Sequence, residues 1–371
     1  MKGLYYYTRK IYQFSQSKPI FERCRGTIIS NTQFPLTHLF FTVKYGPFSS
    51  RIMPKKLRRL PDVAEGLILC HSADKDVPPS SRYERVFVYH GTSDKTFGMP
   101  DRKLDLNWFE RYFLSGPKDL HKLKTYSHHG EDLERKIVKI GMFRSDPLFT
   151  GGYDRGEILE RYRIDSGGKK IILYAPTWAW GGGTLKECFE IFARELLPKY
   201  TLIVRPHFND RANIRAVSEW QRRNRREGLY IFAKQQHDIM DFIMAADLMI
   251  GDNSAVNYEF ALTRRPMVFV KTHEKDVFVP PDEYNVKLCG PTFDPEKDGI
   301  VEKVEEAFGD ARYAKKIAKL VDRSFYFNDG HAVDRACSFI VDRLAQKGII
   351  DRERALRRYG KRFTYTDSYK Y

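Results

Sequence analysis

The chain has 371 residues, of which 42% are hydrophobic and 14% aromatic, and its formal net charge is +16 at pH 7. This length predicts two domains, and the apolar content is sufficient for hydrophobic cores. The five cysteines are widely spaced, with no CxxC pair, which argues against a disulfide framework or a zinc knuckle and for a reducing compartment. The polar N-terminus is unlike a signal peptide, and no apolar run approaches the roughly 20 residues of a transmembrane helix. We therefore expect a cytoplasmic protein.

The first part of the chain contains short apolar runs that are typical of strands. Strands are predicted over Gly26–Ser30, His38–Val43, Gly66–His71, Arg85–His90 and Val138–Gly141. Helices are predicted over Asn107–Leu114, Lys118–Thr125 and the charged part of Pro147–Arg163. Because a Gly-rich turn follows at Asp165–Gly168, we place the linker in this region and predict an N-terminal α/β domain over residues 1–160.

The second part of the chain alternates more regularly between buried strands and amphipathic helices. Strands are predicted over Lys170–Ala175, Tyr200–Arg205, Leu229–Phe232, Asp247–Ile250 and Met267–Val270. Helices are predicted over Leu185–Leu197, Arg211–Arg226, Asp238–Ala246, a segment opened by Ser254, and Ala332–Gln346. This alternation is typical of βαβ units and predicts a parallel sheet in a domain over residues 161–345, followed by a basic tail over residues 346–371.

Polar clusters follow the predicted strands at their carboxyl ends. These clusters are His90–Lys95, Pro176–Trp178 with Gly181–Thr184, Arg205–His207 and Asp252–Ser254. In open parallel sheets, ligands bind beyond the carboxyl ends of the strands. We therefore expect these side chains to line a binding edge, and the edges of two such domains to face one another across a cleft.

Two of the clusters contain histidines suited to catalysis or anion binding. Because histidine as a residue type titrates near neutrality, His90 suits a general base on a hydroxyl, and a histidine that is hydrogen-bonded within its turn is the alternative. Arg205 and His207 together form a fork of donors suited to a phosphate, with a plain Arg-Pro turn as the alternative. The pair His128-His129 is isolated, and we predict no metal site.

The turn Asp252-Asn253-Ser254 joins a strand to a helix, and such turns are suited to anions because backbone N–H groups and the helix dipole favour negative charge. The alternative is that Ser254 or Asp252 only caps the helix. Glu259 in that helix suits a ribose hydroxyl, although most helical glutamates lie on the surface. Glycines 181–183 allow a close backbone approach, but no Gly-Lys-Ser/Thr follows and the segment is not a P-loop.

Three basic runs, Arg51–Arg59, Arg211–Arg226 and the tail after Asp351, predict a surface that attracts polyanions. The candidates are nucleic acid, anionic lipid headgroups and phosphorylated substrates. Aromatic residues between the charges of the tail suit the surface of an anionic membrane. Any single run is also compatible with a simple solvated face.

Six motifs, in order, resemble the CDP-glycerol glycerophosphotransferases, which are teichoic-acid primases and polymerases of the GT-B type. The matching residues are His90-Gly91-Thr92 with Lys95, Gly141 to Asp146 with Arg144, Leu173 to Trp178 with Thr177, Arg205 to His207, Asp247 to Phe260, and Asp329-Gly330 with Arg335. The resemblance spans about residues 85–340. Ser93, Ala179, Phe208, Gly251, Asn253 and Ala255 depart from the family pattern and leave the identity of the donor open.

The resemblance implies an α/β fold of two Rossmann-like domains whose parallel sheets face a central cleft. It also implies transfer of glycerol or ribitol phosphate from a CDP-activated donor to an acceptor hydroxyl on a polymer or lipid-linked primer, with release of CMP. His90 and His207 would be catalytic. Arg205, Asp252–Ser254, Glu259, Thr177 and Arg144 would bind the donor, and Gly91, Thr92 and Lys95 would lie on the acceptor side. No cofactor is expected.

Two alternatives remain from the sequence. A GT-B glycosyltransferase with a nucleotide-sugar donor would share the fold and the cleft. A basic nucleic-acid-binding protein would explain the charge, but the basic runs are dispersed and no nucleic-acid motif is present. We therefore expect a CDP-activated polyol, a polymer or lipid-linked acceptor and an anionic membrane surface as partners, and no nucleic acid.

Overall fold

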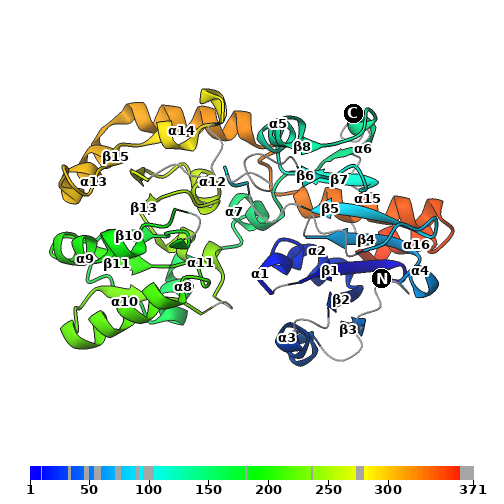
Figure 1. Cartoon of the computed structure of the whole chain (residues 1–371), viewed down its shortest axis with the longest axis horizontal. Coiled ribbons are helices and arrows are strands. Elements are labelled where there is room, and N and C mark those ends of the chain that lie inside the picture. The colour runs from blue at the N-terminus through cyan, green and yellow to red at the C-terminus, as the bar shows by residue number, and fades with distance from the viewer. Residues whose placement is uncertain are drawn as a thin grey trace. The chain divides into compact units, whose positions relative to one another are not determined.

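The computed structural model describes residues 1–9, 11–31, 35–45, 50–53, 60–71, 77–88, 92–94, 104–179, 182–234, 237–272 and 280–359. The chain divides into two compact units, and it enters and leaves each of them more than once (Figure 1). Unit 1 comprises Met1–Gly91, Asp101–Thr150 and Phe325–Tyr371, and unit 2 comprises Thr92–Pro100 and Gly151–Ser324. None of the helices in the described ranges is both long and apolar enough to span a membrane.

In the described part of unit 1, seven strands form one parallel sheet in the order β3-β2-β1-β4-β5-β7-β9. The strands are β1 (Leu4–Thr8), β2 (Thr27–Asn31), β3 (Ser50–Met53), β4 (Gly66–Cys70), β5 (Tyr83–Val88), β7 (Arg111–Leu114) and β9 (Ile137–Lys139). A separate pair joins β6 (Leu104–Asp105) to β8 (Ser127–His128). The helices are α1 (Ile11–Phe14), α2 (Lys18–Cys24), α3 (Pro35–Tyr45), α4 (Leu60–Val63), α5 (Pro117–Tyr126), α6 (Leu133–Lys136), η2 (Phe143–Ser145), α7 (Asp146–Phe149), α15 (Ala332–Gln346) and α16 (Arg352–Tyr359).

In the described part of unit 2, six strands form a parallel sheet in the order β12-β11-β10-β13-β14-β15. The strands are β10 (Ile171–Tyr174), β11 (Thr201–Val204), β12 (Leu229–Ile231), β13 (Leu248–Gly251), β14 (Met267–Val270) and β15 (Thr292–Phe293). The helices are α8 (Arg155–Tyr162), α9 (Leu185–Glu195), α10 (Arg211–Asn224), α11 (Ile239–Ala245), α12 (Val256–Ala261), η4 (Asp282–Tyr284), η5 (Val286–Cys289), α13 (Ile300–Gly309) and α14 (Ala311–Ser324).

Both sheets are doubly wound around a point where the strand order reverses. In unit 2 the reversal lies between β10 and β13, and in unit 1 between β1 and β4. Ligands of doubly wound sheets bind in the crevice beyond the carboxyl ends of the strands at such a switch point. The topology therefore singles out one position in each unit before any side chain is considered.

The core of unit 1 joins the sheet to helices from both ends of the chain. One buried cluster contains Leu4 and Leu69 from the sheet, Phe21 from α2, and Ile340 and Leu344 from α15. Figure 1 shows α15 and α16, in orange and red, beside the blue strands of this unit. Burial of such side chains stabilises a fold by about 1.5–3 kcal/mol each, so α15 is an integral part of unit 1.

The alternation predicted for the second half of the chain is confirmed, and the strand Met267–Val270 and the helix Ala332–Gln346 have the predicted ends. Two of the predictions for the first half of the chain are wrong. The segment His38–Val43 lies in the helix α3, and Asn107–Leu114 contains the strand β7 rather than a helix. Short apolar runs do not distinguish helix from strand, and pairing of β7 with β5 and β9 decides its conformation.

The division of the chain differs from the predicted one. It passes from unit 1 to unit 2 at Thr150 rather than at residue 160, and it returns to unit 1 at Phe325. Consequently α15 is not part of the second domain, and α16 is not part of a separate tail. The physical reason is the apolar face of α15, which completes the core of unit 1. Residues 360–371 of the predicted tail lie outside the described residues.

Candidate functional site

Asp252 occupies the switch point of unit 2, directly after β13. Its side chain is fully buried, and each carboxylate oxygen lies 3.0 Å from the backbone nitrogen of Thr177. The Oδ2 atom also accepts hydrogen bonds from the backbone nitrogen of Thr184 at 3.2 Å and from its hydroxyl at 3.3 Å. Asp252 therefore holds both ends of the loop that follows β10, a role that differs from the helix cap considered from the sequence.

The loop between β10 and α9 is closed so tightly that only glycine fits at position 183. A Cβ atom on Gly183 would lie 2.1 Å from the carbonyl oxygen of Thr177. The Gly183 backbone nitrogen donates to the Trp178 carbonyl at 3.1 Å, and the Thr184 hydroxyl bonds with the Tyr174 hydroxyl at 2.8 Å. The glycines thus allow the loop to pack on itself; Gly181 lies outside the described residues.

The turn after β13 is fixed by its own following helix. Asn257 donates to the carbonyl of Asp252 at 2.6 Å, and the Ser254 hydroxyl accepts from the Val256 nitrogen at 3.3 Å. Asn253 is 4% exposed, and its Oδ1 accepts from the Thr272 hydroxyl at 3.2 Å. Within the described residues its Nδ2 has no hydrogen-bond partner. A buried donor without an acceptor is uncommon, and it marks this turn as a place where a ligand oxygen would be stabilised.

Arg205 and His207 follow β11, as predicted. The guanidinium of Arg205, however, forms hydrogen bonds to backbone carbonyl groups of unit 2. Its guanidinium donates to the carbonyls of Pro206, Phe232 and His237 at 3.0–3.1 Å. It thereby holds the segment between β12 and α11. Burial, followed by the charge of Arg205, lowers the pKa of His237 below its usual value. Arg205 therefore contributes positive charge near this edge, while three of its N–H groups support the loop.

The ring of His207 lies between two aromatic rings. It stacks on Phe208 with a centroid separation of 4.6 Å and on Trp178 with a separation of 6.0 Å. Its Nδ1 accepts a hydrogen bond from the Asn209 nitrogen at 3.2 Å, which places the proton of the neutral ring on Nε2. His207 is therefore oriented as a donor through Nε2.

Besides Asn257, the helix α12 carries two further buried polar side chains. Glu259 is 3% exposed, so it does not lie on the surface. Its neighbour Tyr258 is fully buried and donates to Asp94 at 2.8 Å. Asp94 and the predicted Thr92 are both buried in unit 2. The predicted His90, Gly91 and Lys95 lie outside the described residues.

Arg144 belongs to unit 1, where it is 9% exposed in η2. The motif that contains it supports the fold through Asp146, whose oxygens accept from the nitrogens of Ala332 and Val333 at 2.9 and 2.7 Å. Asp146 therefore caps α15 from a distant part of the chain. Burial raises the pKa of Asp146 to about 6, although these two bonds act in the opposite direction.

The late motif Asp329-Gly330 with Arg335 lies against the same helix end. Arg335 forms an ion pair with Asp329, and its guanidinium carbon lies 4.0 Å from the ring centroid of Phe327. A Cβ atom on Gly330 would lie 2.6 Å from Thr150. The motif that contains Asp146 and the motif that contains Asp329 and Arg335 are far apart along the chain, and both help to fix the N-terminal end of α15 in unit 1.

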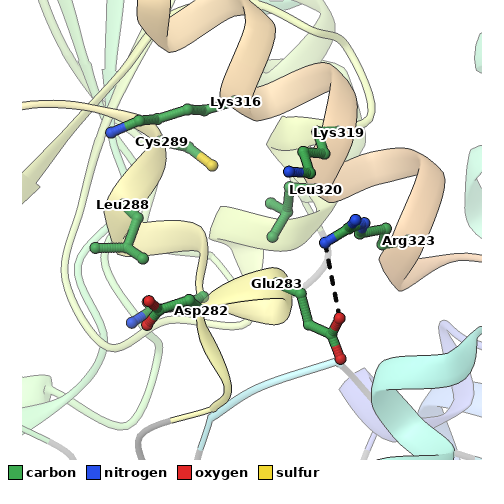
Figure 2. A pocket seen from close by; sticks show the side chains of 9 residues that line it. Asp282, Glu283, Leu288, Cys289, Lys316, Lys319, Leu320 and Arg323 are labelled. Carbon is green, nitrogen blue, oxygen red and sulfur yellow. Dashed lines mark ion pairs between the residues drawn. The ribbon is translucent and has the colours of Figure 1, made fainter.

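A separate hollow of about 230 Å³ lies between α14 and the η4–η5 segment of unit 2 (Figure 2). Lys316, Lys319 and Arg323 from α14 form one wall, and Arg323 pairs with Glu283 across the hollow at 3.7 Å. None of its lining residues was predicted to be functional. In the ranges that the structure describes, no group of three or more His, Cys, Asp or Glu side chains is arranged to hold a metal ion.

The sequence analysis singled out Asp252, Thr177 and His207 and placed Thr184 in one of its polar clusters, but it did not single out Asn257 or Tyr258. Thr184, Asn257 and Tyr258 fix the loops, and none of them has a sequence signal beyond its place next to a strand end. The partner of Thr184 is 68 residues away, which no local pattern indicates.

Comparisons with known proteins agree with this architecture. A family model described as CDP-Glycerol:Poly(glycerophosphate) glycerophosphotransferase matches residues 64–342. The teichoic acid ribitol-phosphate polymerase TarK of Staphylococcus aureus is 29% identical over 220 residues, covering 54% of this chain and 40% of that protein. The teichoic acid glycerol-phosphate primase of Bacillus subtilis is 24% identical over 275 residues, covering 68% of this chain and 66% of that protein.

A solved structure of the wall teichoic acid polymerase TagF superimposes with a TM-score of 0.68 at 18% identity, covering 93% of this chain and 90% of that chain. This likeness confirms the predicted GT-B-like α/β fold class. The chain spans 40% of the length of TarK, so the relatives contain additional segments. The family match extends over more than half of the chain, and it includes the six motifs from His90 to Arg335. The chain belongs to the CDP-glycerol:poly(glycerophosphate) glycerophosphotransferase family.

Proposed function

We propose that this chain transfers a polyol phosphate, glycerol phosphate or ribitol phosphate, from a CDP-activated donor to an acceptor hydroxyl. The acceptor oxygen bonds to the phosphorus that carries the polyol, the bond from that phosphorus to CMP breaks, and CMP leaves. The observation that carries the proposal, beyond the family, is the turn at the switch point of unit 2. There the buried Nδ2 of Asn253 has no acceptor within the described residues.

The donor would lie at the carboxyl edge of β10, β11 and β13. Asn253 and Ser254 would contact the pyrophosphate, and Nε2 of His207 would donate to the phosphate oxygen on which charge develops as CMP departs. Arg205 would add its positive charge, while its N–H groups keep the adjacent loop in place. Asp252 would act by holding this edge together.

The remaining predicted residues complete the proposal. Glu259, buried in α12, would accept a hydrogen bond from the ribose. Thr177 would act through the loop that it closes with Asp252. Arg144, in unit 1, would take part in phosphate binding.

His90 would remove the proton from the acceptor hydroxyl, with Gly91, Thr92 and Lys95 forming the surrounding segment. We infer that the acceptor is a polymer or a lipid-linked primer at the anionic inner surface of the cell membrane. The support is the net charge of +16 and the basic runs of the sequence, which a negative surface would attract.

A thermal-shift panel tests the donor class directly. A ligand that binds only the folded protein raises the melting temperature by mass action. We expect stabilisation by CMP and CDP, and the largest shift with CDP-glycerol or CDP-ribitol. The variant Asn253→Ala should lose most of this shift, whereas the control Asn224→Ala, at the exposed end of α10, should keep it.

Release of CMP in the presence of a polyol-phosphate primer is the second measurement. Stabilisation by UDP-sugars alone would replace the proposal with a glycosyltransferase. The absence of a shift with any nucleotide, together with no CMP release, would overturn it.

A further inference from the structure

Two cysteines from distant parts of the chain meet in the core of unit 1. Cys24 is the last residue of α2, and Cys337 lies in α15. Their Sγ atoms are 2.8 Å apart, although the two residues are 313 positions apart in the sequence. Both belong to the buried cluster of unit 1, and neither is more than 2% exposed. The fold therefore creates a pair of thiols that no sequence spacing indicates.

A second contact joins the two helices beside this pair. Arg23, the residue before Cys24, forms an ion pair with Asp334. Asp334 precedes Cys337 by three residues, and residues three apart lie on the same face of a helix. The same carboxylate also lies 2.8 Å from Nδ1 of His331. One face of α15 thus meets the end of α2 through an ion pair and through the two thiols, which holds the sulfur atoms together.

The two thiols need to move only a short distance to form a covalent bond. The sulfur atoms of a disulfide lie about 2.05 Å apart, so the Sγ atoms of Cys24 and Cys337 would have to approach by about 0.8 Å. Carbon atoms in ordinary non-bonded contact lie about 3.5–4.0 Å apart, and these larger sulfur atoms are already closer than that. A small rotation of either side chain would bring them to bonding distance.

We propose that Cys24 and Cys337 are a site of oxidative modification, at which hydrogen peroxide converts the two thiols into a disulfide that joins α2 to α15. The peroxide oxidises one thiol to a sulfenic acid, and one molecule of water leaves. The sulfur of the second thiol then attacks the sulfenic sulfur, the S–S bond forms, and a second molecule of water leaves. Two electrons pass from the sulfur atoms to the peroxide. Neither step involves the donor or the acceptor of the proposed function.

The environment of the pair makes this reaction conditional. The hydrogen bond to Cys24, followed by burial, raises the pKa of the Cys337 thiol well above its usual value. Because the thiolate is the reactive form, the closed pair is protected, and oxidation requires a transient opening of the contact between α2 and α15. We therefore expect two free thiols in a reducing compartment, and a slow conversion to the disulfide when peroxide is present.

The disulfide would connect the two separate stretches of chain that build unit 1. α2 lies in the stretch Met1–Gly91, and α15 lies in the stretch Phe325–Tyr371. A cross-link restricts the unfolded chain, and its stabilising effect is larger when the closed loop is long. For a unit of this size we expect the melting temperature of unit 1 to rise by about 5–15 °C.

The experiment exposes the full folded chain to hydrogen peroxide and then blocks the remaining thiols with iodoacetamide. Peptide mapping without reductant should show one linked pair of peptides, which contain Cys24 and Cys337 and are together two hydrogen atoms lighter than the separate peptides. The melting temperature should rise by about 5 °C or more and should return to its original value when dithiothreitol is added.

Cys337→Ala cannot form the link and should show no rise in melting temperature after the same treatment. Should this variant fail to fold, Cys24→Ala removes the same bond from the side of α2. Cys188→Ala is the matched control, because Cys188 is also fully buried and burial raises the pKa of its thiol to about 12. It lies in α9 of unit 2, so the control should keep both the linked peptides and the rise in melting temperature.

A second treatment covers the case in which peroxide does not reach the folded pair. The chain is unfolded in urea and refolded in a glutathione redox buffer, in which oxidised glutathione accepts the two electrons. Absence of the link between Cys24 and Cys337 after both treatments, or linkage mainly between other cysteines, would overturn the proposal. A link that forms without raising the melting temperature would show that the disulfide does not constrain unit 1, which would also contradict it.

Discussion

The two units share a strand order but differ in the side chains at their switch points. In unit 1, His71 follows β4 and is fully buried, with Nδ1 2.9 Å from the Tyr7 carbonyl and Nε2 2.6 Å from the Ser17 hydroxyl. In unit 2, Asp252 holds two backbone nitrogens, and the adjacent Asn253 keeps a buried donor without an acceptor in the described residues.

The difference shows that a switch point alone does not make a binding site. In unit 1, among the described residues, both ring nitrogens of His71 have partners within the unit. In unit 2 a carboxylate organises the surrounding loops, and an amide donor remains available. We therefore expect substitutions at the unit 1 switch point to change stability alone, and substitutions at the unit 2 switch point to change nucleotide binding as well.

The largest effect is expected for Asp252→Asn. This change removes the charge from the bonds to Thr177 and Thr184 and places an amide hydrogen against a backbone N–H. Hydrogen bonds to a charged group contribute about 1.5–3 kcal/mol each, so the free energy of unfolding should fall by about 4 kcal/mol. Urea unfolding measures the loss of stability, and the CDP-glycerol thermal shift measures the loss of nucleotide binding. Unchanged nucleotide binding in the variant would show that the switch point of unit 2 does not differ from that of unit 1 in this respect.

A pH-dependent effect is expected for Asp146, which supports unit 1. Its pKa is raised from 3.8 to about 6 on folding, so the folded protein binds the proton more tightly. The stability from this group is present below pH 4 and is lost as the pH rises through 6, by about 3 kcal/mol. Asp146→Asn should abolish this part of the pH dependence in urea unfolding between pH 4 and 7. An unaltered pH profile would contradict the assignment.

A smaller loss is expected for His71→Leu at the switch point of unit 1. The Ser17 hydroxyl, which is fully buried, would lose its partner at a cost of about 2 kcal/mol. The double variant His71→Leu/Ser17→Ala removes both polar groups and should recover part of that loss. Chemical denaturation gives both values. Because both ring nitrogens of His71 already bond within unit 1, the CDP-glycerol shift should remain, and its disappearance would show that unit 1 also binds the nucleotide.

Replacing Gly183 tests the closed loop of unit 2. A Cβ atom would meet the Thr177 carbonyl, so the loop must move and Gly183→Ala should lose about 1.5 kcal/mol of stability. Gly309→Ala is the control, because nothing lies within 4 Å of a Cβ atom there. The melting temperatures of the two variants test this prediction. Equal values would show that the loop can accommodate a Cβ atom at position 183.

The smallest effect is expected for Arg205→Lys. Lysine keeps the charge but cannot reach the three carbonyls that the planar guanidinium bonds, so stability should fall by about 1 kcal/mol. Donor affinity, measured by titration calorimetry, should change less than about threefold because the positive charge persists. A large loss of affinity at unchanged stability would indicate that Arg205 acts mainly as a phosphate ligand.

The first half of the chain shows where reading the sequence fails. The central strand β1 (Leu4–Thr8) was not predicted, because its tyrosines give the N-terminus a polar appearance although Tyr6 and Tyr7 are buried. In α3 and β7, aromatic-rich runs fit either conformation, and neighbouring segments decide between them. Propensity is a weak guide where an element is short and its partners are distant.

The alternating α/β pattern of the second half, and the polar residues at the ends of its strands, could be predicted without a structure. Hydrophobic periodicity and turn residues are local properties, so they are visible without a structure. Three features could not be predicted in this way: Asp252 holds a loop 75 residues away, Asp146 caps a helix 186 residues away, and α15 belongs to unit 1. Such contacts depend on how distant segments pack and on which buried polar groups find partners, and no local pattern contains that information.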